Sequence, residues 1–165
     1  GQEAFYNCTS LTSCTFSESS QITDISYGAF ASCTKLTTIN LPDSVKTIDE
    51  FAFSQCSSLT SINLPASLTT IGKQAFFGCK LTTISIPQLV TTIGMEAFAS
   101  NWTLNQITFN NIDITFEYGV FLECSSIIEA FYLNTFQNDP HLSTFKTDMQ
   151  TAAGTGISVN FVAIS

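Results

Sequence analysis

The sequence of 165 residues predicts an α/β solenoid: about six coils of roughly 23 residues, stacked in one direction and closed by a C-terminal cap. Three observations predict it. A Phe recurs at a fixed step, each copy carries a short segment in which apolar and polar residues alternate, and the repeat is lost after Leu133.

An Ala-Phe or Val-Phe pair marks each coil, and its Phe recurs at steps of 25, 23, 23, 22 and 23 residues. The Phe column is Phe5, Phe30, Phe53, Phe76, Phe98 and Phe121. Three residues after each Phe lies a second column, Cys8, Cys33, Cys56, Cys79, Asn101 and Cys124. Cys and Asn share small size and hydrogen-bonding capacity but not redox or metal chemistry. We therefore predict that this second column is a buried structural ladder bonded to loop backbone.

The pattern L-x-x-I-x-L predicts a short, half-buried strand in each coil, because its last three positions alternate between apolar and polar. It occurs at 11–16, 36–41, 59–64, 81–86 and 104–109. A second apolar piece leads to a turn at Gly72 or Gly94, and then to a predicted short helical or 3₁₀ stretch that carries the Phe. One such unit cannot bury its own apolar face, whereas stacked copies can.

The C-terminal segment breaks the pattern. We predict a repeat array over 1–133 and a capping segment over 134–165, with Asp139 as helix N-cap, Pro140 as first helical residue, Gly154 as helix stop and a strand over 157–164. At the other end, GQEAF (1–5) aligns with GKQAF (72–76), so the array begins in the middle of a repeat. We expect the chain to be a fragment of a longer array.

Composition argues against several classes of partner. Five Lys, no Arg and thirteen acidic residues give a net charge of −8, which disfavours binding to nucleic acid and to anionic membrane surfaces. No apolar run reaches the ~20 residues that a membrane span needs, so we expect no membrane insertion.

Catalytic and metal-binding patterns are not apparent. The single His141, a sequence without C-x-x-C, and acidic pairs at turns predict no catalytic residue, no metal and no cofactor. Disulfides between neighbouring coils are geometrically poor but stay open, because parallel strands lie ~4.8 Å apart whereas bonded Cβ atoms lie at ~3.8 Å. Of two glycosylation sequons, Asn101 is expected to point inward, and Asn7 stays open as an exposed acceptor.

The extended pattern L-T-x-I-x-L-P-x-S-V-x-x-I-G-x-x-A-F-x-x-C resembles the BspA-like leucine-rich repeats over residues 1–133. It departs from that family where Cys79 and Leu81 are one residue too close, at Asn101, and at Gly119-Val120-Phe121. The resemblance implies a right-handed superhelix with short parallel strands on its concave face. It also implies a surface-exposed or secreted protein, in a family of which several members bind host or matrix proteins.

The outward positions of the strands are the surface left for function. They are small, polar and almost uncharged, and we predict that they contact a partner protein: Ser13, Thr15, Thr38, Asn40, Ser61, Asn63, Thr83, Ser85, Gln106, Thr108 and Glu129. We accordingly predict a non-enzymatic adhesion or protein-binding module at the cell surface or secreted, with a host matrix or cell-surface protein as partner. Two alternatives stay open. One is a structural spacer that displays another domain. The other is an ice binder using Thr47, Thr70, Thr92 and Thr115, a column disturbed by Lys46 and Ile114.

Overall fold

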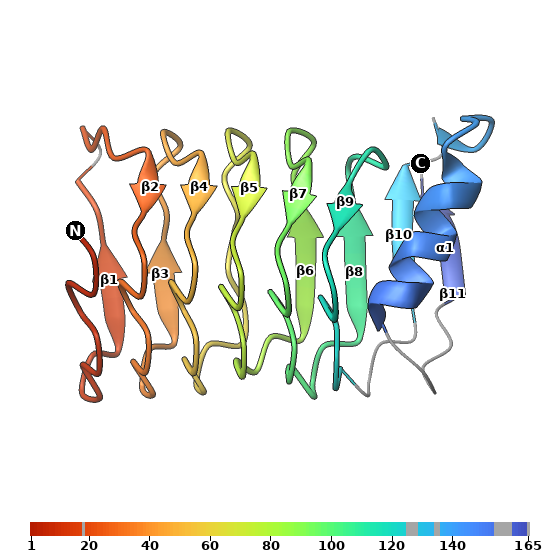
Figure 1. The fold of residues 1–165 in the computed structure, drawn as a ribbon. Coiled ribbons are helices and arrows are strands. Elements are labelled where there is room, and N and C mark those ends of the chain that lie inside the picture. The colour runs from red at the N-terminus through yellow and green to blue at the C-terminus, as the bar shows by residue number, and fades with distance from the viewer. Residues whose placement is uncertain (18, 125–128, 134–135, 154–159, 165) are drawn as a thin grey trace.

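The repeats stack side by side along one axis, with a helix at the C-terminal end (Figure 1). The computed structural model describes residues 1–17, 19–124, 129–133, 136–153 and 160–164. In these ranges the chain is a solenoid of parallel strands, and α1 (Leu142–Ala153) follows the repeats. No helix in these ranges has the length and apolar character needed to cross a membrane.

The strands of the coils form two rows. The row that we call the front row lies on the far side in Figure 1 and holds β1 (Ser13–Thr15), β3 (Thr38–Asn40), β6 (Thr83–Ile86), β8 (Gln106–Phe109), β10 (Glu129–Leu133) and β11 (Asn160–Ile164). The back row is one sheet of two-residue strands: β2 (Asp24–Ile25), β4 (Thr47–Ile48), β5 (Thr70–Ile71), β7 (Thr92–Ile93) and β9 (Thr115–Phe116). All pairings are parallel and place equivalent residues of successive coils opposite each other, as in Thr47↔Thr70↔Thr92. The stacked architecture predicted from the repeat is therefore confirmed.

The front row is interrupted at the third coil, where the predicted strand over 59–64 is wrong. This segment makes only an isolated bridge, Asn40↔Asn63, so β1–β3 and β6–β8–β10–β11 are two separate sheets. The fourth coil has one residue fewer between Cys79 and Leu81 than the others have between the equivalent positions. The last backbone bond before the break joins the Thr82 N–H to the Thr60 carbonyl at 3.0 Å. The missing residue lies just ahead of this bond in the chain, and we therefore attribute the interruption to it.

The stretch that carries the Phe is a turn, not the predicted helical or 3₁₀ stretch. Two residues of every coil adopt positive φ: the residue just ahead of Ala or Val, and the residue two positions after the Phe. The first column is Glu3, Gly28, Phe51, Gln74, Glu96 and Gly119, and the second is Asn7, Ser32, Gln55, Gly78, Ser100 and Glu123. Nine of these twelve are not glycine, although this conformation costs a residue with Cβ roughly 1–2 kcal/mol.

Hydrogen bonds between coils offset that cost. In each of five steps along the array, the N–H groups of the two positive-φ residues and of the Phe between them donate to carbonyls of the next coil, at 2.7–3.0 Å. The Phe bonds run, for example, from Phe53 N–H to Ala75 and from Phe76 N–H to Ala97. The left-handed residues aim alternate N–H groups along the stacking axis, so the turns form three ladders without being strands.

The Phe rings stack directly on one another. Successive centroids from Phe5 to Phe121 lie 5.1–5.7 Å apart, with interplanar angles of 2–10°. From Phe30 onward these rings are buried together with the Leu and Ile columns in one continuous core. Gly72 and Gly94 serve this packing, because a Cβ on either would lie 2.7 Å from the backbone nitrogen of Glu50 or Lys73.

The C-terminal helix covers the last coil. Leu142, Phe145, Met149 and Ala152 form its buried face, and the Phe145 ring meets Phe109 edge-on at 5.0 Å. The Phe121 N–H donates to the carbonyl of Ala152, at 3.0 Å, in the place where earlier Phe residues find the next coil. One of the three turn ladders therefore continues into α1.

The helix begins at Leu142, two residues after the predicted first residue Pro140. Asp139 accepts a bond from the His141 N–H at 2.8 Å, as an N-cap side chain does. Strand β11 begins at Asn160 and pairs with β10. Gly154, the predicted helix stop, and residues 157–159 of the predicted last strand lie outside the described residues.

Candidate functional site: the outward side of the front row

The front row turns two columns of side chains outward, because alternate residues of a strand face opposite sides. On the inner side, Ile39, Ile84 and Ile107 are buried. The outer side carries all eleven residues predicted to contact a partner. Nine of them are exposed, whereas Thr108 and Glu129 are half-buried. We call these eleven residues the polar face.

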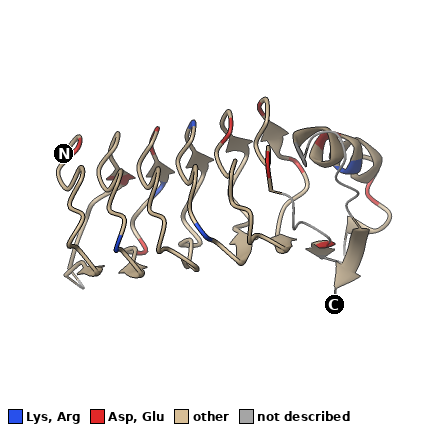
Figure 2. Cartoon of the chain, turned by 90° about the horizontal axis from the view of Figure 1, so that it is seen from below, with Lys and Arg blue, Asp and Glu red and all other residues tan. Residues whose placement is uncertain are grey.

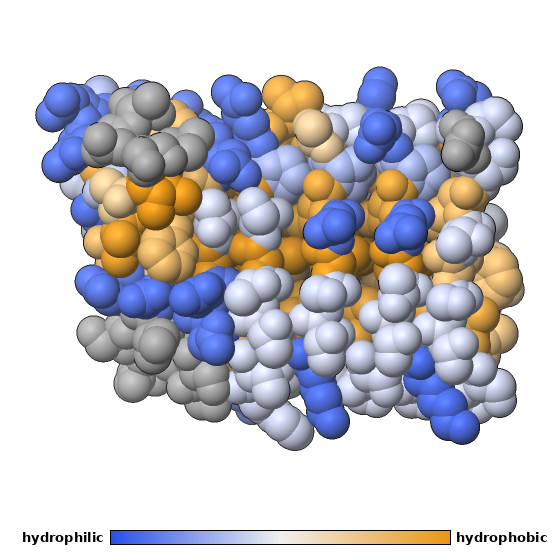
Figure 3. Space-filling model, turned by 180° about the vertical axis from the view of Figure 1, so that it is seen from behind, coloured by the Kyte–Doolittle hydropathy of each residue, from blue (hydrophilic) through white to orange (hydrophobic). Residues whose placement is uncertain are grey.

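Strand pairing aligns the polar face into rows. Ser13 lies opposite Thr38 and Thr15 opposite Asn40, while Thr83, Gln106 and Glu129 follow one another across the second sheet. Viewed from this side, the surface has mainly the intermediate colour of Ser and Thr, with apolar colour between the rows and at the C-terminal end (Figure 3). There the outward positions become Phe131 and Val162.

Charge is nearly absent from the polar face. Glu129 is its only charged member, and it accepts a 3.3 Å bond from Gln106. Lys, Asp and Glu are scattered over the loops of the described chain and form no basic cluster (Figure 2). A surface of this kind offers hydrogen bonds and shape to a neighbouring molecule, but no long-range electrostatic attraction.

Most of its polar groups are free to bind. Within the described residues, the side chains of Thr38, Asn40, Ser61 and Asn63 make no hydrogen bond, whereas Asn110 donates to Ser85 Oγ at 3.1 Å. The interruption between 61–64 and β6 opens a groove of about 630 Å³ in the middle of the face, with Ser61 and Asn63 on one wall and Thr83 and Ser85 on the other.

Other hydroxyl residues, which the sequence did not distinguish from these, bind the neighbouring coil instead. Ser44, Ser58, Ser67 and Thr103 donate to carbonyls of the preceding coil at 2.6–2.9 Å. They lie in the loops ahead of the strands and recur at matching places in successive repeats. Their recurrence as Ser or Thr in a loop column was the signal that could have identified them.

The Cys and Asn column contacts the Phe turns. The thiols of Cys33, Cys56, Cys79 and Cys124 donate to the carbonyl of the preceding coil's Phe at 3.0–3.2 Å. Asn101 is fully buried and donates to the Phe76 and Phe98 carbonyls at 2.8 Å. Its Oδ1 also accepts from the Leu81 N–H at 3.1 Å.

Cys8 is the exception in this column, because it is exposed rather than buried. All six cysteines are free thiols. Burial raises the pKa of Cys56 and of Cys124 to about 12, and raises the pKa of Cys79 well above its usual value. These thiols therefore stay protonated and unreactive at neutral pH.

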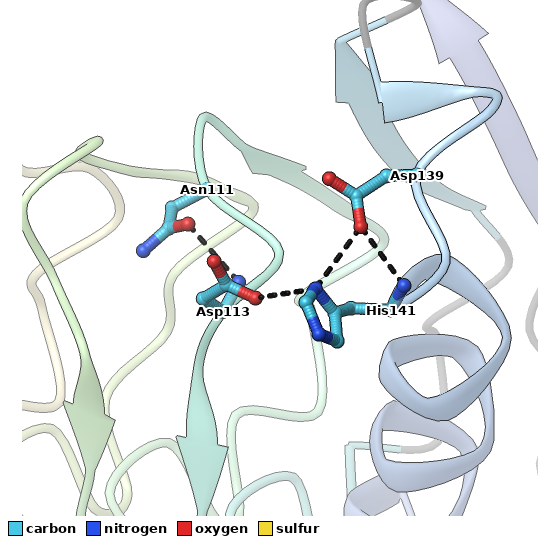
Figure 4. Close-up of polar contacts among 4 residues, drawn as sticks. All are labelled: Asn111, Asp113, Asp139 and His141. Atoms are coloured by element: carbon cyan, nitrogen blue, oxygen red, sulfur yellow. Dashed lines mark hydrogen bonds and ion pairs between the residues drawn. The ribbon is translucent and has the colours of Figure 1, made fainter.

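His141 lies beside two carboxylates at the junction of the cap and the last described coil (Figure 4). Its Nδ1 is 3.1 Å from Asp139 Oδ1 and 3.5 Å from Asp113 Oδ1, and its side chain is 67% exposed. The Asp113 N–H donates to Asn111 Oδ1 at 3.0 Å.

The acidic residues Glu117 and Glu123 accept hydrogen bonds from Met95 N–H and Ser100 Oγ, both at 2.7 Å. Among the described residues, no three His, Cys, Asp or Glu are grouped to hold a metal ion.

Comparison with known proteins identifies the repeat. The family profile of the BspA type leucine rich repeat region matches six copies, over residues 1–101 and 23–146. No curated protein matches the sequence. A leucine-rich repeat protein from Bacteroides ovatus is similar in structure, at 37% identity and a TM-score of 0.69 over 79% of this chain and 34% of that one.

Two further structures extend the comparison. The leucine-rich repeat protein of T. pallidum matches 99% of this chain and 78% of its own at 29% identity, with a TM-score of 0.73. A leucine-rich cell surface protein of Faecalibacterium prausnitzii matches 80% of this chain and 51% of its own at 25% identity, with a TM-score of 0.55. This chain thus spans about a third of the B. ovatus protein. The family is one of protein-interaction and surface modules, and the chain belongs to the BspA-type leucine-rich repeat family.

Proposed function

We propose that the chain is a non-enzymatic protein-binding module of a cell-surface or secreted protein, and that it contacts a host matrix or cell-surface protein through the polar face. One observation carries the proposal. The face combines eleven aligned outward side chains, almost no charge, and polar groups that the fold leaves unbonded at Thr38, Asn40, Ser61 and Asn63.

Small hydroxyl and amide side chains lose little conformational entropy when a partner fixes them. Hydroxyls elsewhere in the chain, such as those of Ser58 and Ser67, are committed to backbone carbonyls. The polar face is thus the part of the surface where hydrogen bonds remain available over several coils. The similarity in structure between this chain and a cell-surface protein from F. prausnitzii supports a location at the cell surface.

The test is a charge substitution on the polar face. The triple variant Asn40→Lys, Asn63→Lys, Ser85→Lys adds three cations in neighbouring coils at exposed positions. Binding to immobilised extracellular-matrix extract and to host cells should fall at least tenfold, while the melting temperature stays within about 2 °C, because none of the three side chains is buried.

A matched control carries the same charge elsewhere. Thr23→Lys, Thr69→Lys, Thr91→Lys places three lysines ahead of the back-row strands, in the column where Lys46 already lies. Binding should be retained in this control. Equal loss in both variants would show that charge, not the polar face, decides binding. Wild-type chain that shows no saturable binding would support a spacer instead.

A further inference from the structure

A second surface feature lies at the turns of the fourth coil, away from the polar face. The coils before and after it have two residues between the column of cysteines and the following Leu, namely Ser57-Ser58 and Trp102-Thr103. The fourth coil has only Lys80 there. One residue is thus missing between two coils that are complete, and the surface is hollowed at that place.

The hollow is a notch of about 320 Å³, and its main contacts come from Gln55, Phe77, Gly78, Lys80, Ser100 and Trp102. Trp102 is the single tryptophan of the chain, and it is 64% exposed. Other coils have Thr or Ser at its position, as at Thr34 and Ser57. Trp102 makes no ring stacking contact within the described residues, so its indole face is available.

Gly78 keeps the notch open. It occupies the second positive-φ column, with φ +65°, where four of the other coils carry Ser, Gln or Glu and one carries Asn. A Cβ at Gly78 would lie 2.6 Å from Gln55 Nε2, so a side chain here would displace the amide that forms one wall. The missing residue, Gly78 and the exposed Trp102 thus all shape the same notch.

The chemistry of the notch is apolar with one positive charge. Phe77 and Trp102 supply aromatic surface, and Lys80 is the only charged residue that lines it. Aromatic side chains in a partly enclosed hollow are typical of the few residues that dominate protein interfaces. Lys80 at the rim of the hollow attracts a carboxylate at short range, although the net charge of the chain is −8.

We propose that this notch is a docking site for a protein segment that presents one aromatic or long aliphatic side chain next to a carboxylate. The apolar side chain packs between Phe77 and Trp102, and the carboxylate pairs with Lys80. The site is separate from the polar face, because none of the eleven residues of that face lines the notch.

The test selects phage-displayed random 12-residue peptides on the wild-type chain, with the Trp102→Thr variant as the subtractive bait. Thr is the residue of an ordinary coil at this position, and the exposed indole contributes little to packing, so the variant folds. Enriched peptides should carry Phe, Tyr, Trp, Leu or Met within two residues of Asp or Glu. They should bind the Trp102→Thr variant at least tenfold more weakly, measured by fluorescence polarisation.

Two more variants separate the parts of the proposal. Lys80→Glu should weaken the selected peptides at least threefold and, used as bait, should enrich peptides with Lys or Arg beside the apolar residue. The polar-face triple variant should bind the peptides as wild type does, so failure of the proposed function leaves this result unaffected. Enrichment without acidic residues, no enrichment over the Trp102→Thr bait, or unchanged binding by that variant would overturn the proposal.

Discussion

The turn side and the front row of strands are built from the same repeats, yet they differ in regularity. On the turn side, the Phe stack and its three hydrogen-bond ladders run through all six coils, including the fourth, which is one residue short. In the front row, the sheet is interrupted between β3 and β6, next to this shortened coil. The turn side therefore sets the stacking of the coils, and the front row tolerates local change.

The largest effect should come from breaking the Phe stack. Phe76→Ala removes a fully buried ring between Phe53 and Phe98, and should lower the free energy of unfolding by about 3–5 kcal/mol. Urea unfolding followed by far-UV circular dichroism measures it. Phe76→Leu is the control and should cost less than half as much. A loss below 1 kcal/mol for Phe76→Ala would show that the turn side does not set the stacking.

The Asn101 rung tests the ladder at its one departure from Cys. Asn101→Ala leaves the Phe76 and Phe98 carbonyls and the Leu81 N–H without this partner, and should cost about 3 kcal/mol. Asn101→Cys restores a donor to the Phe76 carbonyl, as Cys79 provides one to Phe53, and should recover about half of the loss. If both variants unfold at the same urea concentration, hydrogen bonding by this column is not what stabilises the turns.

Alkaline pH should lower the free energy of unfolding, because the buried thiols of the cysteine column lose protons more easily in the unfolded chain. Burial raises the pKa of Cys56 and Cys124 to about 12 from an ordinary 9.0, so between these values the unfolded chain has lost protons that the folded chain keeps. Stability is then complete below pH 9 and falls as pH rises toward 12, by about 1.4 kcal/mol per pH unit for each thiol. Urea unfolding at pH 8, 9 and 10 gives the slope.

The Cys56→Ala, Cys124→Ala double variant supplies the reference for that slope, because it lacks only these two thiols and keeps every other side chain. Its stability should fall less steeply with pH than that of the wild type. Parallel pH profiles for the two proteins would contradict the assigned role of the buried thiols.

The smallest effect is expected on the polar face. Thr38→Ser and Thr83→Ser alter exposed side chains that make no hydrogen bond within the described residues, and should change stability by less than about 0.5 kcal/mol. Thr103→Val is the contrast, because it removes a 2.9 Å bond to the Leu81 carbonyl and should cost about 1 kcal/mol. Equal effects at exposed and bonded positions would remove the distinction between free and committed hydroxyls.

Much of the fold follows from spacing in the sequence. The interval between Phe53 and Phe76 predicts stacked coils, and the substitution of Asn101 for Cys indicates a hydrogen-bonding column, because each inference needs only a period and a residue type. The turns could not be predicted in the same way. Phe51 and Gln55 adopt positive φ only because neighbouring coils supply carbonyls for their N–H groups, and that is a tertiary effect.

The interruption of the front row also escaped prediction. LTSINL (59–64) and LTTINL (36–41) have the same apolar pattern, yet only the second contains a strand. Whether a segment becomes a strand depends on its neighbour, and the neighbour of 59–64 is the shortened coil. The outward positions of the polar face follow from the alternation of apolar and polar residues along each strand. The notch at Trp102 could not be predicted in this way, because it depends on how three successive coils are placed in space.

The bond from Phe121 to Ala152 has a consequence for the length of such arrays. Each coil edge presents backbone groups that can form hydrogen bonds with a further coil. A helix has carbonyls in its last turn with no partner of their own, and α1 gives one of them to the N–H that a further coil would have used. The helix therefore takes the place of a coil in one of the three turn ladders. Coils gained or lost ahead of Phe121 would leave this contact unchanged.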